Sequence, residues 1–111
     1  YAFYLAKTYY EELIAGGVQI YEYTPGFVHA KVFTSDDDTA TVGSINLDYR
    51  SLYLHFECGV FIYRNPVVRD IEKDFQDTLE KCQKVTMTEV RNRSTFVKIY
   101  GQVLRLVAPL M

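Results

Sequence analysis

Six polar or flexible residues at fixed spacing between His29 and Asn46 constrain this chain more than any other feature. The stretch reads His-Ala-Lys, four residues, Asp36, six residues, and then Gly-Ser-Ile-Asn. In an extended segment, side chains two residues apart lie on the same face. A strand from Val28 to Ser35 would therefore present His29 and Lys31 together, which combines an imidazole with a fixed positive charge.

The residues that follow predict a hairpin that returns to this histidine. Asp36–Asp38 predict a polar turn, and Thr39–Gly43 predict the returning strand. Its last residue, a glycine, lets the backbone approach a ligand closely, and Ser44 and Asn46 add a hydroxyl and an amide. Imidazole, ammonium, hydroxyl and amide at one place predict a phosphate site with a built-in nucleophile or acid.

The full spacing resembles the HxKxxxxDxxxxxxGSxN signature (the HKD motif) of the phospholipase D superfamily at every position. The resemblance covers nearly the whole chain and is densest from Gly17 to Tyr63. Within the superfamily, the chain is most similar to the second, C-terminal half of a bacterial cardiolipin synthase. Three segments carry this finer likeness: Asn46–Ser51, Phe56–Glu57 and Val103–Leu110.

Hydrophobic periodicity and turn residues predict a layered α/β unit. The expected elements are a helix over residues 3–14 ended by Gly16-Gly17, strands at 18–23, 28–35, 39–43 and 55–63, a helix from Asn65-Pro66 to about Cys82, a short turn before Arg91 and a last helix capped by Ser94. The strand at 55–63 is expected to be central. The resemblance implies a phospholipase D-like half-domain over residues 1–111, with a mixed sheet flanked by helices and one HxK motif per chain.

The resemblance also implies the chemistry. Two such halves form one site, where one histidine attacks phosphorus to give a phosphohistidine and the other protonates the leaving alcohol. His29, in the C-terminal half, would be the acid and base. Lys31 would balance the charge of the phosphate in the transition state. The reaction would join two phosphatidylglycerol molecules into cardiolipin and release glycerol, without a cofactor or a metal.

The other motif residues have supporting roles in this scheme. Ser44 and Asn46 would donate hydrogen bonds to the phosphate oxygens, or else merely form the turn. Asp36 and Gly43 are expected to be structural. A catalytic role for Asp36 is disfavoured because a carboxylate beside a phosphate would be repulsive.

A second carboxylate is of more interest. Glu57 interrupts an apolar run, where an unpaired charge is costly to bury. Related enzymes have an acidic residue here that bonds the second nitrogen of the HxK histidine, so the resemblance makes Glu57 a catalytic residue. His55, where cardiolipin synthases commonly have asparagine, is given no role. No zinc-type ligand spacing is present.

Charge is unevenly distributed. The net charge is -2 overall, but residues 84–111 contain five basic side chains and one acidic side chain. The acidic balance of residues 1–83 argues against a nuclease, whose groove should be electropositive. Two alternatives stay open: phosphodiester hydrolysis of a phospholipid or nucleic acid, and a catalytically silent module that binds anionic lipid or docks another subunit.

The expected partners are a phospholipid, a membrane surface and another HKD half, either from the same parent chain or from a homodimer mate. The segment 94–111 predicts an amphipathic helix that either enters the lipid interface or packs on the domain. No apolar run is long enough to span a bilayer, and the resemblance places spanning helices upstream in a longer parent protein. It implies a bacterial cell membrane, with the catalytic part facing the cytoplasm.

The two cysteines have no metal-like spacing. Cys58 falls in an apolar strand pattern and Cys82 falls on the apolar stripe of a predicted helix. Both are therefore predicted to be reduced core residues, in agreement with a reducing compartment.

Overall fold

The computed structural model describes residues 2–108, which form two compact units. The central unit runs from Tyr23 to Cys82. The terminal unit combines the residues up to Glu22 with those from Gln83 onward. Small sheets and helices make up both units, so the α/β class predicted from the sequence is confirmed.

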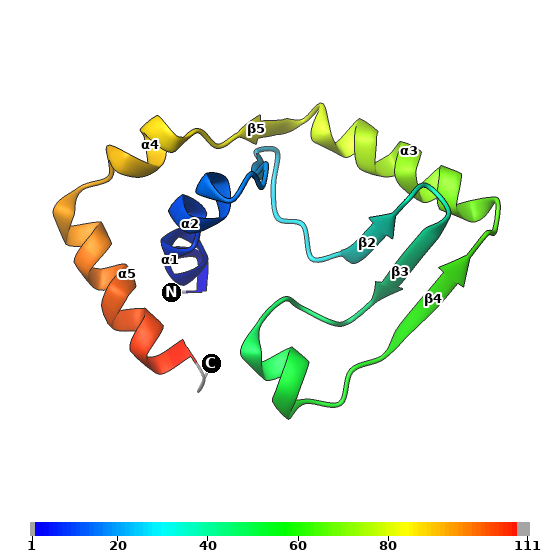
Figure 1. Cartoon of the computed structure of the whole chain (residues 1–111), viewed down its shortest axis with the longest axis horizontal. Helices are drawn as coiled ribbons and strands as arrows, with labels where there is room; N and C mark the ends of the chain where they lie inside the picture. The colour runs from blue at the N-terminus through cyan, green and yellow to red at the C-terminus, as the bar shows by residue number, and fades with distance from the viewer. Residues whose placement is uncertain (1, 109–111) are drawn as a thin grey trace. The chain divides into compact units, whose positions relative to one another are not determined.

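The central unit is built on a three-stranded antiparallel sheet. Its strands are β2 (Lys31–Ser35), β3 (Thr39–Gly43) and β4 (Gly59–Tyr63), in the order β2-β3-β4. Helix α3 (Val67–Leu79) packs on β2 and β3 and lies alongside the strands in Figure 1. The predicted hairpin is confirmed. Its turn has left-handed backbone at Asp36 and Asp37, a conformation that aspartate tolerates better than most residues.

One face of this sheet carries the core. Ala40 pairs across the sheet with Thr34 and Ile62, so the three side chains share the face that meets α3. Ala40 and Val68 of α3 are each only 1% exposed. Before the helix, the side chain of Asn65 accepts a hydrogen bond from the backbone N–H of Val67 at 3.0 Å. Proline was predicted at the first helical position, but Pro66 is the N-cap residue and the helix begins at Val67.

Several predicted boundaries in the central unit are wrong. The strand expected at 28–35 begins only at Lys31, and the strand expected at 55–63 begins only at Gly59 and lies at an edge of the sheet. Cys58 is exposed, and Cys82 lies in a strand instead of a helix. Hydrophobic composition alone cannot separate an apolar loop from a buried strand, which explains these errors.

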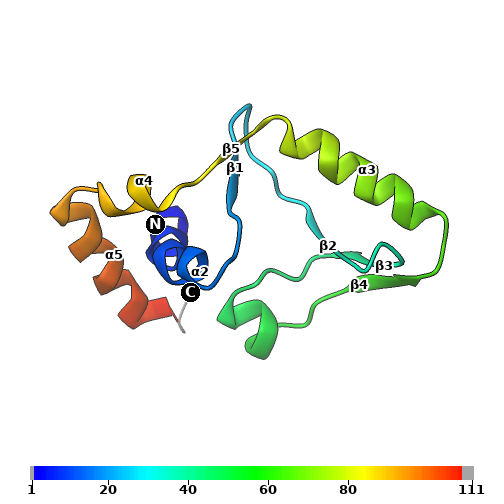
Figure 2. The same ribbon diagram turned by 45° about the horizontal axis from the view of Figure 1, so that its top comes forward.

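Among its described residues, the terminal unit contains helices and most of a short sheet, whose strands β1 (Tyr21–Tyr23) and β5 (Cys82–Lys84) are labelled in Figure 2. The helices are α1 (Ala2–Thr8), α2 (Tyr10–Ala15), α4 (Met87–Arg91) and α5 (Thr95–Val107). Strand β1 pairs with β5 where the chain passes between the units. The Ser94 hydroxyl accepts from the N–H of Val97 at 3.3 Å, so the predicted cap of the last helix is confirmed.

The first helical segment is divided, although the sequence predicts one helix. The Thr8 hydroxyl donates to the carbonyl of Leu5 at 2.7 Å, and this local bond competes with continuation of the helix. The predicted end at the glycine pair is confirmed. The N–H groups of Gly17 and Val18 donate to the carbonyls of Ile14 and Leu13, and Gly17 has a φ of 93° that suits glycine.

A glycine sets how closely α1 and α5 pack. A Cβ atom on the buried Gly101 of α5 would lie 2.5 Å from Cγ2 of Thr8. Beside this contact, the rings of Tyr4 and Tyr100 meet edge to face, with centroids 5.8 Å apart. The face of α5 that includes Gly101 therefore packs within the terminal unit.

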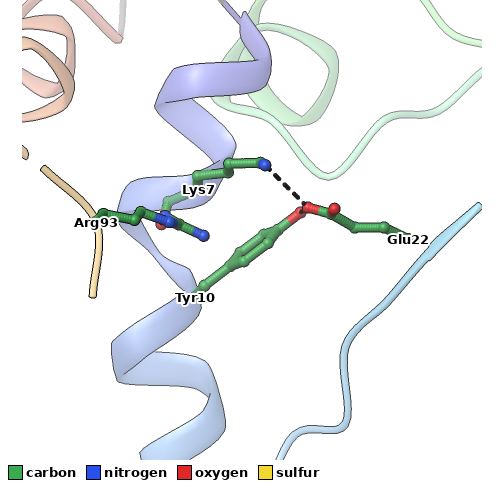
Figure 3. A network of polar contacts seen from close by, with 4 residues as sticks. All are labelled: Lys7, Tyr10, Glu22 and Arg93. Carbon is green, nitrogen blue, oxygen red and sulfur yellow. Dashed lines mark hydrogen bonds and ion pairs between the residues drawn. The ribbon is translucent and has the colours of Figure 1, made fainter. Parts of the chain in front are cut away.

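A polar network joins three segments of this unit (Figure 3). The Tyr10 hydroxyl donates to Oε1 of Glu22 at 3.1 Å, and Nζ of Lys7 lies 3.4 Å from the same oxygen. The Arg93 guanidinium lies 5.3 Å from the centre of the Tyr10 ring and donates to the carbonyl of Lys7 at 2.8 Å. Burial, and then the negative charge and hydrogen bond of Glu22, raise the pKa of Tyr10 to about 12.

Tyr10→Phe should change how the stability of the chain depends on alkaline pH. The pKa of Tyr10 is raised by folding, so its contribution is complete below the unfolded value of about 10 and is lost as the pH rises toward 12. The variant should lose ~1 kcal/mol at neutral pH, because it lacks the hydrogen bond to Glu22. Above pH 10 its free energy of unfolding should fall less steeply than that of the parent.

Urea denaturation across this pH range measures the difference between parent and variant. Tyr21→Phe is the matched control, because the Tyr21 hydroxyl is exposed and donates to the uncharged Gln19. Parallel curves for Tyr10→Phe and the parent above pH 10 would contradict the prediction.

Candidate active site

The imidazole of His29 and the ammonium of Lys31 lie side by side. Nζ of Lys31 is 2.9 Å from Nε2 of His29 and also donates to the carbonyl of His29 at 2.6 Å. An ammonium group can only donate, so Nε2 of His29 accepts this hydrogen bond through its ring electron pair. Both groups are accessible to a ligand. His29 lies just before β2 instead of within it, yet the predicted pairing of the two side chains is found.

The register of the sheet brings the two ends of the motif together. Lys31 pairs with Gly43 across β2 and β3, and Gly43 pairs with Gly59 across β3 and β4. A Cβ atom at Gly43 would lie 2.4 Å from the carbonyl oxygen of Cys58 and 2.6 Å from Cα of Gly59. Only glycine fits at this position, so the expectation that Gly43 is structural now has a physical cause.

Hydrogen bonds of Ser44 link the residues that follow β3 to the residues that precede β4. Its N–H donates to the carbonyl of Cys58 at 2.9 Å, and its hydroxyl oxygen accepts from the N–H of Cys58 at 3.1 Å. The hydroxyl also donates to the Glu57 carboxylate in a short hydrogen bond. Ser44 therefore fixes both the backbone of Cys58 and the side chain of Glu57.

The Glu57 carboxyl has a pKa below its ordinary value. The hydrogen bond from Ser44 is the largest cause, followed by one from Ser51 and by the charge of His55. Within residues 2–108, no hydrogen bond joins Glu57 to His29. The partner found for Glu57 is Ser44, and its expected bond to the motif histidine stays a prediction.

The two remaining motif residues have few side-chain contacts. Asp36 accepts a hydrogen bond from the Ser35 hydroxyl at 3.3 Å, within the hairpin turn. Its neighbour Asp38 is the better-connected carboxylate, because it accepts from Thr39 at 2.8 Å and pairs with Arg64 at 3.8 Å. Asn46 is exposed and is not hydrogen-bonded through its side chain to any residue described here. The roles of Asp36 and Asn46 stay predictions.

A second histidine of this region was given no role from the sequence. Nε of Arg50 donates to Nε2 of His55 at 2.7 Å, across the one-turn π-helix η1 (Arg50–Leu54). Asp48 precedes this turn and accepts from the N–H of Ser51 at 2.7 Å. The signal for this arrangement was the run of Asp48, Arg50 and His55, whose donors and acceptors match, but a π-helix has no recognisable sequence pattern.

Comparison with known proteins settles the family. Residues 2–79 match the family described as "Cardiolipin synthase, PLD-like domain". The chain belongs to this family. The match includes the whole HKD motif and ends with helix α3, so the family assignment made from the motif is confirmed.

Individual bacterial relatives match over nearly the whole chain. A Streptococcus mutans protein named "Uncharacterized protein" is 51% identical over 98% of the chain and 24% of its own length. Proteins named "Cardiolipin synthase" from Clostridium perfringens (strain SM101) and Halalkalibacterium halodurans are 40% and 36% identical, over 96% and 98% of the chain and 22% of their own lengths. The chain thus spans less than a quarter of these relatives. No solved structure matches it.

Two features are absent from the described residues. Between residues 2 and 108, no helix is long and apolar enough to cross a membrane. In the same range, histidine, cysteine, aspartate and glutamate side chains do not gather in groups of three or more that could hold a metal ion.

Gly43→Ala should destabilise the central unit. The added methyl group would meet backbone atoms of Cys58 and Gly59, which cannot rotate away, so β3 and β4 must separate. We expect a loss of about 1–3 kcal/mol in the free energy of unfolding, measured by urea denaturation. Gly26→Ala is the matched control, because nothing lies within 4 Å of a Cβ atom there. Equal stability of the two variants would contradict this account.

Ser44→Ala should raise the pKa of Glu57, because the variant removes the largest cause of its lowering. A lowered pKa means that the ionised carboxylate stabilises the folded state above the ordinary glutamate value of about 4.3, and that this stabilisation is lost as the pH falls. An NMR titration of the Glu57 carboxyl carbon measures the change. Ser35→Ala, which removes the hydroxyl that donates to Asp36, is the control. An unchanged pKa in Ser44→Ala would show that the short bond does not persist in solution.

Proposed function

We propose that this chain supplies one catalytic half of a phosphatidyltransferase that makes cardiolipin from two phosphatidylglycerol molecules and releases glycerol. The approach of Lys31 Nζ to His29 Nε2, at 2.9 Å within a complete HKD motif, is the observation that carries the proposal. The names of the Clostridium and Halalkalibacterium relatives support the choice of reaction.

The proposed reaction has two steps, which need two imidazoles. In the first, one histidine attacks phosphorus. A phosphorus–nitrogen bond forms, the bond to the glycerol oxygen breaks, and the other histidine protonates that oxygen. In the second, the hydroxyl of another phosphatidylglycerol attacks phosphorus, the histidine leaves, and the other histidine takes the hydroxyl proton. We assign this acid and base role to His29. Its Nε2 must carry a proton in the first step, which requires Lys31 Nζ to leave that nitrogen, and the deprotonated Nε2 then takes the hydroxyl proton in the second step.

The neighbouring residues are assigned by their charge and donors. Lys31 balances the phosphate charge, and because its ammonium already touches the imidazole it can do so without a large movement. Asn46 donates to a phosphate oxygen, and Ser44 does so once its single hydroxyl proton has left the Glu57 carboxylate. Glu57 positions the Ser44 hydroxyl that donates to it and, when the site is assembled, the motif histidine. Asp36 and Gly43 shape the hairpin.

A second HKD half must complete the site, because the chain has one copy of the motif. We propose that this half belongs to the same longer protein, as the greater length of the relatives suggests, or to a second copy of this chain. The working place would be the inner side of a bacterial cell membrane, where phosphatidylglycerol is found. The isolated chain should be inactive unless it pairs with itself.

The net negative charge of the central unit disfavours hydrolysis of nucleic acid. The central unit, which carries the motif, has ten acidic and six basic side chains, whereas a nucleic-acid groove should be electropositive. Hydrolysis of phospholipids differs from the proposed transfer only in the final acceptor, water instead of an alcohol, so product analysis separates the two. A silent lipid-binding module would yield no product at all.

A chimera tests the proposal directly. The chain replaces the aligned 107 residues of the Clostridium perfringens relative, which supplies the remaining protein. With phosphatidylglycerol, the chimera should form cardiolipin and glycerol, separated by thin-layer chromatography. His29→Ala should reduce turnover by at least about a hundredfold, because general acid–base catalysis typically contributes that much.

His55→Ala is the matched control, because it removes an imidazole of the same unit that lies outside the motif, and it should retain most of the turnover. Phosphatidic acid in place of cardiolipin would indicate a hydrolase. Lipid binding without product, unchanged by His29→Ala, would indicate the silent module.

A further inference from the structure

One side of helix α5 presents apolar side chains to solvent. Phe96, Ile99, Val103 and Leu106 are 78%, 60%, 57% and 83% exposed, and we call them the apolar stripe. They recur at helical spacing on a single side of the helix. Ile99, Val103 and Leu106 also line a shallow groove together with Lys98 and Gln102.

The packing of α5 uses a different side of the helix. Gly101 is buried against α1, and Arg105 donates to Glu12 of α2 at 3.0 Å while its guanidinium lies 4.5 Å from the centre of the Tyr9 ring. The terminal unit therefore holds α5 through these residues. The sequence left open whether this helix packs or enters lipid, and the structure shows packing on one side with exposed apolar groups on another.

The charges around the stripe favour an anionic surface. Helix α5 contains two basic residues and no acidic residue; Arg105 is paired with Glu12 on the packed side, so Lys98 is the basic residue of the helix that lies beside the stripe. Lys98 borders the stripe, and its Nζ donates to the carbonyl of Arg91 at 2.9 Å. A second copy of the chain would bring like charges together, which disfavours self-association through this side.

The borders of the stripe match a lipid interface. Lys98 lies along one border and Tyr100, 41% exposed, lies along the other. Lysine keeps its charge in water while its carbon chain covers apolar surface, and tyrosine places an apolar ring beside a polar hydroxyl. An apolar helix face with cationic and aromatic borders is the pattern of helices that lie in the plane of the headgroups.

We propose that helix α5 seats its apolar stripe in the surface of an anionic lipid bilayer. The helix begins after residue 79, where the family match ends, and it contributes no residue to the candidate active site. The inference deepens the proposed function by naming a surface for the bilayer. It rests on that function only for the choice of phosphatidylglycerol as the probe lipid.

Vesicle sedimentation with the full chain tests the proposal. The chain should sediment with vesicles of equal parts phosphatidylglycerol and phosphatidylcholine, and much less with vesicles of phosphatidylcholine alone. Leu106→Gln should weaken the partition coefficient at least about tenfold, because it removes a leucine from the buried apolar area. Lys98→Gln should weaken it about fivefold at low salt and less at high salt.

Leu54→Gln is the matched control, because Leu54 is 60% exposed but belongs to the central unit and not to α5. It should bind vesicles as the parent does, and circular dichroism should show that all variants fold.

Three results would overturn the proposal. The first is equal vesicle binding by Leu106→Gln and the parent, and the second is equal binding of the parent to both kinds of vesicle. The third is a dimer of the parent in sedimentation that Leu106→Gln disrupts, while neither protein binds vesicles. Turnover of the chimera is measured separately, in detergent micelles. Normal turnover without vesicle binding overturns only this proposal, whereas vesicle binding without turnover overturns only the catalytic one.

Discussion

The contact of Gly43 with the backbone of Cys58 and Gly59 is the constraint on which the central unit depends. At this point three strands meet in one row, Lys31 with Gly43 and Gly43 with Gly59, and no side chain separates the last two. The row places the start of β2 next to the end of β3. The histidine at the beginning of the motif and the serine near its end therefore adjoin, along the chain, the paired ends of these two strands, two residues before Lys31 and one residue after Gly43.

The hydrogen bonds of Ser44 extend this constraint beyond the sheet. Once β3 and β4 are in contact, the Ser44 backbone and hydroxyl reach Cys58, and the same hydroxyl reaches Glu57. A carboxylate that would otherwise lie free on a loop is thereby held in one place. The turn around η1 adds a separate pair, Arg50 with His55, so the loop before β4 is ordered by polar contacts instead of by burial.

Much of the site was predictable from the sequence, because fixed spacing converts directly into geometry in a hairpin. His29 and Lys31 are separated by one residue, and Asp36–Asp38 form a turn of the expected length, so the pairing of the two strands follows. The beginnings of the strands were not predictable, since the apolar residues before Gly59 lie in an exposed loop. The bond between Glu57 and Ser44 was missed because it depends on the β3–β4 register, which the sequence does not specify in advance.

In the terminal unit, too, some features were predictable from the sequence and others were not. The stop at Gly16-Gly17 and the cap at Ser94 were predictable, because each rests on the chemistry of one or two residues. The break in the first helix was not, because it arises from competition between the Thr8 hydroxyl and the backbone. Which side of α5 packs was not predictable either, since the choice depends on Gly101 meeting Thr8 on a distant segment.

The bond between Lys31 and His29 has a consequence for the resting protein. While the ammonium occupies the electron pair on Nε2, that nitrogen cannot accept a proton from another group. A phosphodiester that attracts the ammonium to its own oxygens releases the nitrogen in the same movement. Under the proposed function, an anionic phosphodiester would free this nitrogen to exchange a proton, whereas a neutral molecule of similar shape would leave it bound to the ammonium.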